Sequence, residues 1–343
     1  MLRLTTFLLL AGALALPASA QFGQGTREVT KRGTTAADFL TIPVGARATA
    51  MGNAVSALVD DGTSVYWNPA GLSKMRSGAL TAEYADWLVG MNFNFVSVAV
   101  PTRNGTFAAG ITAMRTPEME VTTVDFQNGT GETYTAGSYA VAFSYARALT
   151  DRFSIGASAK YITERIWNSS SAGVAFDIGT LFETPFRGIR LGASISNFGS
   201  KLRLTGDDLL VVVDIDPNAE GNNQSNRAEL RTDAFDMPLT MRIGLATEVF
   251  QNEQGRLTVA VDALNPNNSE QYVNVGAEAG FLGDLVMLRA GYSELFLSDN
   301  TRSFTLGGGL RYDFTGLNFG VDYAYEAQEF FDGVNRFTIA LGF

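Results

Sequence analysis

The sequence predicts an all-β fold: a 14-stranded antiparallel transmembrane β-barrel with a small, partly helical plug at its N-terminus. Three observations favour it. The mature chain is apolar overall, yet it lacks a run of the roughly 18 apolar residues that a membrane helix needs. From Ala79 onward, apolar and polar residues alternate in segments of about ten, as in membrane barrels. Every second link between these segments is short.

A secretion signal comes first. Residues 1–20 contain the basic Arg3, an apolar run, and Ala18-Ser19-Ala20, which matches a small-x-small cleavage site. The run is too short for a transmembrane anchor. We therefore expect export, with cleavage after Ala20, to the outer membrane of a Gram-negative bacterium. The expected regions are a signal peptide at 1–20, an N-terminal plug or hatch segment at 21–78 and the barrel at 79–343.

The strands follow one another at regular intervals. In the segment 317–326, for example, Leu317, Phe319 and Val321 share one face and polar or small residues share the other. A soluble sandwich would show the same alternation, but it has no reason to sort its loops by length, as outer-membrane barrels do. The fourteen expected strands are 79–87, 91–100, 105–115, 139–149, 153–165, 173–183, 189–199, 238–249, 256–264, 271–281, 285–296, 302–314, 317–327 and 335–343.

Composition excludes several functions. Acidic residues outnumber basic ones by 35 to 25, which argues against a nucleic-acid partner. The chain has no histidine and no cysteine, so imidazole and thiolate chemistry are unavailable. We expect no enzyme activity, no metal and no cofactor. One weak alternative is calcium at residues 214–220, where oxygen ligands alternate but a loop glycine is missing.

Residues 64–75, SVYWNPAGLSKM, stand at the junction between the non-alternating segment and the first strand. Upstream, residues 45–59 are rich in Ala, Met and Val and predict a small helix, which Asp60-Asp61-Gly62 would end. Pro69 favours extended geometry before it, and Gly71 could supply a positive φ for a sharp reversal. We expect this segment to fill the wide lumen of the barrel. The alternative is an exposed periplasmic turn.

Charged residues also occupy the polar face of the later strands. They mix both signs, so they can pair with one another and hold a plug, or they form only a structural ladder of charges. The expected lumen-facing charges are Arg242, Glu248, Asp262, Glu278, Arg289, Arg311, Asp313, Asp322 and Arg336.

Residues 45–75 resemble the N-terminal motif of the PorV/PorQ family, which belongs to the wider group typified by the fatty-acid transporter FadL. Beyond this motif the resemblance covers the strand count and the terminal Phe343, which looks like the assembly signal read by the barrel-insertion machinery. The matching residues are Gly45, Ala46, Arg47, Ala48, Met51, Gly52, Asp60, Asp61, Trp67, Asn68, Pro69, Ala70, Gly71 and Leu72.

The resemblance implies two functions. PorV-type proteins act in type IX secretion, which would give this chain secretion-system subunits or exported cargo as partners, bound through the external loops 116–138 and 200–237. FadL-type proteins pass hydrophobic molecules across the outer membrane, with the N-terminal hatch as the gate. The motif does not separate these branches. We favour the secretion or surface-display role, with hydrophobic transport as the alternative.

Overall fold

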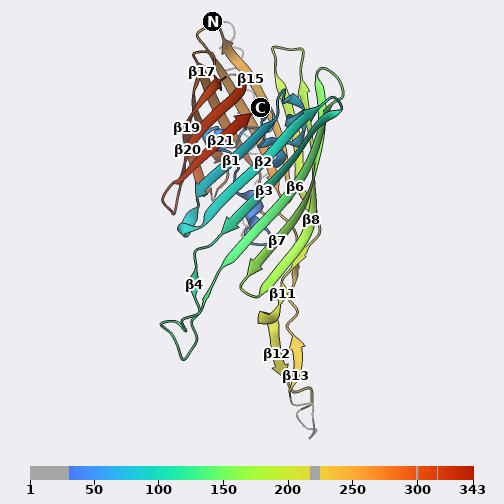
Figure 1. Ribbon diagram of the computed structural model, residues 1–343, viewed down its shortest axis with the longest axis vertical. Coiled ribbons are helices and arrows are strands. Elements are labelled where there is room, and N and C mark those ends of the chain that lie inside the picture. Colours follow the sequence, from blue (N-terminus) through green and yellow to red (C-terminus); the bar gives the residue numbers. More distant parts are fainter. Residues whose placement is uncertain (1–30, 217–224, 299, 315) are drawn as a thin grey trace, which may run out of the picture.

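The computed structural model describes residues 31–216, 225–298, 300–314 and 316–343, and the expected signal peptide lies outside them. One antiparallel sheet of fifteen strands dominates the fold (Figure 1). One of these strands, β11 (Thr205–Gly206), only extends β8, so fourteen strands form the ring, which closes where β1 pairs with β21. The predicted 14-stranded barrel is confirmed.

The ring strands lie close to their predicted positions. The largest shifts are at β6 and β8, which begin three and four residues earlier than expected. The strands are β1 (Ala79–Asp86), β2 (Asn92–Thr102), β3 (Gly105–Arg115), β6 (Ala136–Ala148), β7 (Phe153–Ile166), β8 (Ser169–Glu183), β9 (Arg190–Gly199), β15 (Thr240–Gln251), β16 (Gly255–Pro266), β17 (Tyr272–Phe281), β18 (Val286–Leu295), β19 (Arg302–Phe314), β20 (Leu317–Gln328) and β21 (Val334–Gly342).

The outer face of the barrel is apolar. Along β2, Val96, Val98 and Val100 are 40–45% exposed, whereas the alternate residues Phe95 and Ala99 are buried in the lumen. Side chains of a strand point alternately to its two faces, so this pattern runs around the ring. A soluble protein rarely leaves so large an apolar surface bare. The belt therefore fits the hydrocarbon core of an outer membrane.

The two ends of the barrel differ. The connections at one end, such as Arg103–Asn104, are short turns, whereas the other end bears the long links 116–135 and 200–239. We call the latter end external, because outer-membrane barrels have their longer loops outside. These links carry small strand pairs that project beyond the wall (Figure 1). The pairs are β4 (Met119–Glu120) with β5 (Thr133–Tyr134), β10 (Leu202–Arg203) with β14 (Ala234–Phe235), and β12 (Leu210–Val213) with β13 (Asn226–Glu229). The short helix η4 (Asp207–Leu209) directly precedes β12. A further short helix, η3 (Leu88–Gly90), links β1 to β2.

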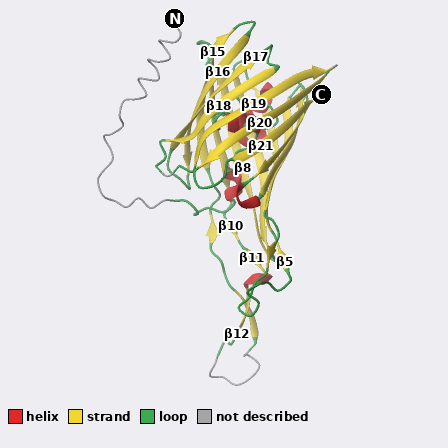
Figure 2. Cartoon of the chain, turned by 90° about the vertical axis from the view of Figure 1, so that its left-hand side faces the viewer, coloured by secondary structure: helices red, strands yellow, loops and turns green. Residues whose placement is uncertain are grey.

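The plug lies inside the ring (Figure 2). Its elements are the 3-10 helices η1 (Asp38–Thr41) and η2 (Pro69–Lys74) and the α-helices α2 (Ala46–Ala50) and α3 (Ser64–Trp67). It starts at the external end, where the N–H of Ala36 donates to the Asp236 carbonyl (2.9 Å). It then descends to the opposite end and enters β1. Among the described residues, no helix is long and apolar enough to cross a bilayer.

The helix predicted over 45–59 is wrong beyond Ala50. Gly52 and Asn53 both adopt positive φ, which ends the helix and turns the chain. The turn lies against the wall, where a Cβ on Gly52 would come within 2.6 Å of backbone atoms of Val275 and Tyr292. Contact with the wall therefore overrides the local helical preference of the Ala-rich stretch.

Candidate functional site: a plugged lumen and an external pocket

One side of the plug is bound to the wall by ion pairs. Arg47 of α2 donates from Nε to Glu278 (3.1 Å) and from Nη1 to Asp60 (2.7 Å), while Asp61 lies 3.9 Å away. The charge of Glu278 raises the pKa of Arg47 well above its usual value, although burial opposes it. The guanidinium therefore stays charged at any physiological pH.

The ion pairs continue along the wall from Glu278. This carboxylate also binds Arg256 (2.7 Å) and Arg289 (2.6 Å). Arg289 in turn binds Asp322 (2.7 Å), which accepts from Arg311 (3.0 Å). Four of the charges that the sequence analysis expected in the lumen thus belong to one network: Glu278, Arg289, Arg311 and Asp322.

A second buried network holds the start of α2. Arg336 lies 3.0 Å from Glu83 and donates to the Pro43 carbonyl (2.8 Å), and all three groups are buried. Glu83 also accepts from the N–H of Gly45. The sequence analysis missed Glu83, although it alternates with Thr81 and Ala85 on the inner face of β1.

The remaining expected charges have different surroundings. Asp262 accepts from the N–H groups of Val55 and Ser56 and from the Ser56 hydroxyl, so it fixes the middle of the plug. Arg242 lies 5.2 Å from the centre of the Trp67 ring. Glu248 and Asp313 are exposed, and Glu248 lies 3.6 Å from Arg190.

The NPAGL motif forms the other contact between plug and wall. The Asn68 amide donates to the carbonyls of Ser56 (2.8 Å) and Thr180 (3.1 Å), and its oxygen accepts from Ala70 (3.1 Å). Asn68, Pro69, Ala70 and Leu72 are all buried, so the motif is not an exposed turn. Gly71 lies within η2 rather than at positive φ, and its importance is the lack of a Cβ, which would stand 2.2 Å from the Val59 carbonyl oxygen.

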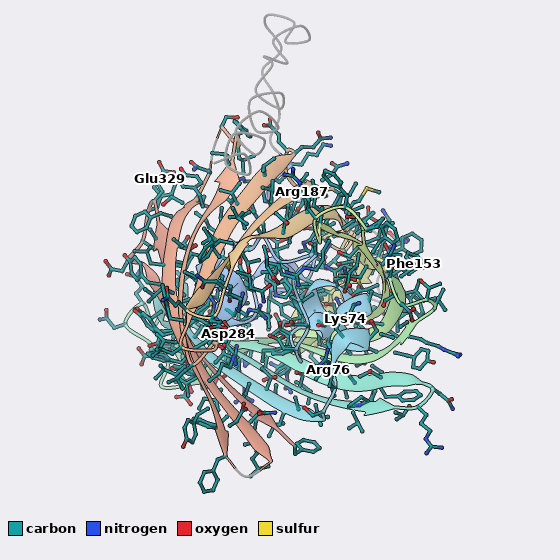
Figure 3. The ribbon with its side chains drawn as sticks, turned by 90° about the horizontal axis from the view of Figure 1, so that it is seen from above. Lys74, Arg76, Phe153, Arg187, Asp284 and Glu329 are labelled. Atoms are coloured by element: carbon teal, nitrogen blue, oxygen red, sulfur yellow. The ribbon has the colours of Figure 1, made fainter. Side chains whose placement is uncertain are left out.

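The plug and wall also approach each other closely around this motif. A Cβ on Gly156 of β7 would come within 2.5 Å of the backbone of Pro69 and Ala70. Leu72 packs with small wall residues, including Ala108 and Ala142. Figure 3, viewed from the end with the short turns, shows Lys74 within the ring, with Phe153 and Arg187 on the surrounding wall. Other residues of the motif also contact the wall or the plug. The indole N–H of Trp67 donates to the Val44 carbonyl within the plug (2.7 Å), and Met51 is buried. The N–H of Gly52 donates to the Thr305 hydroxyl of the wall (3.0 Å).

A cavity of about 450 Å³ opens at the external end, above the start of the plug. Such a volume is typical of small-molecule sites. A second cavity, of about 410 Å³, adjoins it and shares Ile166 and Leu204 as lining residues. We call the first cavity the external pocket. Its apolar lining comprises Ala36, Met114, Ala136, Ile166, Leu202, Leu204 and Phe235.

The polar groups of the external pocket are mostly engaged within the protein. Glu164 accepts from the N–H of Ala37 (3.0 Å) and from the hydroxyl of Ser138 (3.4 Å). Thr232 donates to the Leu204 carbonyl (2.7 Å). The sequence analysis did not find this pocket, because its lining comes from the plug, four wall strands and two external links.

Other expected sites lie elsewhere. Phe343 is half exposed, and its N–H donates to the Gly78 carbonyl (2.8 Å), joining the end of the chain to the start of β1. Among the described residues, no group of three or more Asp or Glu side chains could hold a metal ion. Much of the stretch 214–220 considered for calcium falls outside the described residues.

Comparisons with known proteins place the chain by its fold. No family model matches it, and no curated protein matches its sequence. Among solved structures, it is similar to the monoaromatic hydrocarbon channel CymD, with a TM-score of 0.54 and 14% identity over 88% of this chain and 97% of that one. It is also similar to the Pseudomonas putida toluene transporter TodX, with a TM-score of 0.55 and 13% identity over 87% of this chain and 97% of that one. The Ralstonia pickettii toluene transporter TbuX gives a TM-score of 0.52 and 13% identity over 87% and 97%. This chain therefore shares the barrel fold of hydrophobic-molecule channels, whereas a PorV/PorQ assignment has no support from sequence comparison.

Proposed function

We propose that this protein is a FadL-type channel for the passive uptake of small hydrophobic molecules across the outer membrane. The observation that carries the proposal is the external pocket, because its apolar lining and volume suit a small hydrophobic ligand. Its position, above the first residues of the plug, favours a role as the entry site. The fold shared with hydrocarbon and toluene channels is consistent with this role.

The plug would then act as the hatch of the channel. Its side chains and backbone occupy the lumen below the external pocket, and ion pairs such as Arg47–Glu278 tie it to the wall. A lipophilic molecule that reached the pocket would need the plug to rearrange before it travelled further. The protein would carry out no chemistry on this molecule.

Uptake measurements on a matched pair of variants test the proposal. Leu204→Asp places a charge in the external pocket, whereas Leu230→Asp makes the same change on an exposed residue outside it. In cells expressing the protein, we expect Leu204→Asp to reduce uptake of radiolabelled toluene about tenfold or more, because a bound apolar ligand would strip water from the new carboxylate. Leu230→Asp should transport normally. Uptake that was equal in cells with and without the protein would refute the function.

A secretion or surface-display role is the second proposal. It is favoured by the external links, which project from the barrel and expose Val124, Phe126, Val212 and Ile215 to water. Exposed apolar residues of this kind are typical of protein-binding surfaces. Mass spectrometry after gentle extraction from native membranes tests it: secretion subunits or cargo at stoichiometric amounts would support it, and a protein recovered alone would refute it.

A further inference from the structure

We infer that the external pocket selects uncharged hydrophobic molecules and rejects carboxylates, and that Glu164 determines this specificity. The inference rests on the proposed function and names the class of ligand for the same site. It follows from the charges around the pocket, from the use of its hydrogen-bond donors, and from the cost of burying an ion.

Two carboxylates line the pocket against one cation. Glu164 lies on the inner face of β7, one residue before the exposed Arg165 on the outer face, and Asp233 lies on the loop above. Arg165 donates from Nε to the Trp167 carbonyl (2.9 Å), which directs its guanidinium toward the short turn between β7 and β8. The charges of the lining residues therefore sum to minus one, and the carboxylate of Glu164 is the charge that faces inward.

Several hydrogen-bond donors of the lining are already used. The N–H of Ala37 and the hydroxyl of Ser138 both donate to Glu164. The hydroxyls of Thr116 and Thr232 donate to the carbonyls of Ala136 (3.3 Å) and Leu204 (2.7 Å). A carboxylate needs donors to replace the water that it loses on binding, and a hydrocarbon does not.

An anion therefore meets two penalties in this pocket. It would lose hydration where the donors beside Glu164 are already engaged, and it would approach a carboxylate of the same sign. An apolar molecule meets neither penalty, because it needs only the contact with side chains such as Ile166, Leu202 and Phe235. Hydrocarbons and other uncharged apolar molecules thus suit the pocket better than fatty-acid anions.

Three probes with the same ring and a two-carbon arm test the inference: ethylbenzene, 2-phenylethanol and phenylacetate. Their binding to the purified full-length protein in neutral detergent at pH 7.5 can be measured by titration calorimetry. We expect ethylbenzene to bind at least tenfold more tightly than phenylacetate, with 2-phenylethanol between them. In Glu164→Gln, phenylacetate should bind about tenfold more tightly than in the natural protein, whereas ethylbenzene should change less than twofold. Glu329→Gln, an exposed acid that does not line the pocket, should leave all three values unchanged.

The outcomes separate the inference from the proposed function. Equal binding of ethylbenzene and phenylacetate, or an unchanged phenylacetate affinity in Glu164→Gln, would overturn the role of Glu164 while leaving the channel intact. Failure of all three probes to bind would overturn the proposed function itself. If Glu164→Gln does not fold, the natural protein still gives a test. Salt screens like-charge repulsion, so phenylacetate affinity should rise between 0.05 and 0.5 M salt, and a flat response would contradict the inference.

Discussion

The plug meets the wall through two contacts, at α2 and at η2, which differ in the interactions that hold them. At the α2 contact, Arg47 and the start of the helix are held by buried ion pairs with β17, β21 and β1. At the η2 contact, Asn68 and Leu72 pack against β6, β7 and β8, where wall residues are small and the backbones nearly touch. Both contacts are closely packed, but buried ion pairs are found at the α2 contact, whereas the η2 contact relies mainly on close packing and on the hydrogen bonds of Asn68. The η2 contact also lies next to the covalent link to β1.

This difference suggests how the plug could open. The partners of an ion pair regain hydration when water enters between them, whereas a close-packed contact gains no such compensation. We expect the α2 contact to release first and the η2 contact to remain as the fixed end. Three variants and one change of pH test this contrast.

Glu278→Gln should have the largest effect. It removes the shared partner of Arg47, Arg256 and Arg289, and breaking a buried pair by removing one partner costs about 3–5 kcal/mol. Thermal unfolding in detergent, followed by heat-dependent gel mobility, should show a lower midpoint, with faster hydrogen exchange at residues 45–61. Glu253→Gln, an exposed acid in a turn, is the control. Unchanged exchange in Glu278→Gln would mean that the ion pairs do not hold the plug.

Asn68→Asp should come next. The two carbonyls of Ser56 and Thr180 would lose their donor and face a carboxylate, and each unsatisfied buried group costs about 1–3 kcal/mol. Hydrogen exchange should rise mainly at residues 64–75, which would separate this variant from Glu278→Gln. The exposed Asn128→Asp should behave like the natural protein. The same exchange pattern in both plug variants would mean that the two contacts open together.

Gly156→Val tests shape alone. Its side chain would collide with the backbone of Pro69 and Ala70, and overpacking of this kind costs about 1–3 kcal/mol. We expect displacement of the NPAGL motif and a larger ion conductance in planar bilayers. Gly308→Val is a matched control, because a Cβ there meets nothing closer than 3.4 Å. Equal conductance in the two variants would exclude a sealing role for the η2 contact.

Alkaline pH should give the smallest effect. The single hydroxyl proton of Tyr66 is shared between the carbonyls of Leu40 (2.8 Å) and Ile42 (2.7 Å), and burial raises the pKa of the hydroxyl to about 12. The folded state therefore favours the protonated form, so this stability is complete below the unfolded pKa of about 10 and is lost as pH rises through 12. In Tyr66→Phe this part of the pH dependence should disappear, whereas the exposed Tyr161→Phe should keep it. The measurement is the unfolding midpoint between pH 9 and 12.5.

The wall could be predicted from the sequence and the plug only in part. β7 and β19 lie within one residue of their expected bounds, because alternation and turn residues are local signals. The helix expected beyond Ala50 failed because contact with Val275 and Tyr292 decides the backbone there. Alternation also identified the inner face that carries Glu278 and Asp322, but it could not show that Arg47, 231 residues away from Glu278, would bind it.

The external pocket was beyond sequence analysis for a related reason. Its lining residues, such as Ala36, Leu204 and Phe235, come from segments without regular periodicity, and only the folded external links bring them together. Long links are variable in structure and often functional. Their length therefore indicated a functional region, but it did not identify the residues that line the pocket.

Crystals soaked with iodobenzene would show whether a small hydrophobic molecule binds in the external pocket, because anomalous scattering locates the iodine atom. The proposed channel predicts a strong peak in the external pocket, between Ile166, Leu202 and Phe235. A pocket without a peak at saturating iodobenzene, with iodine only on the outer wall of the barrel, would contradict it.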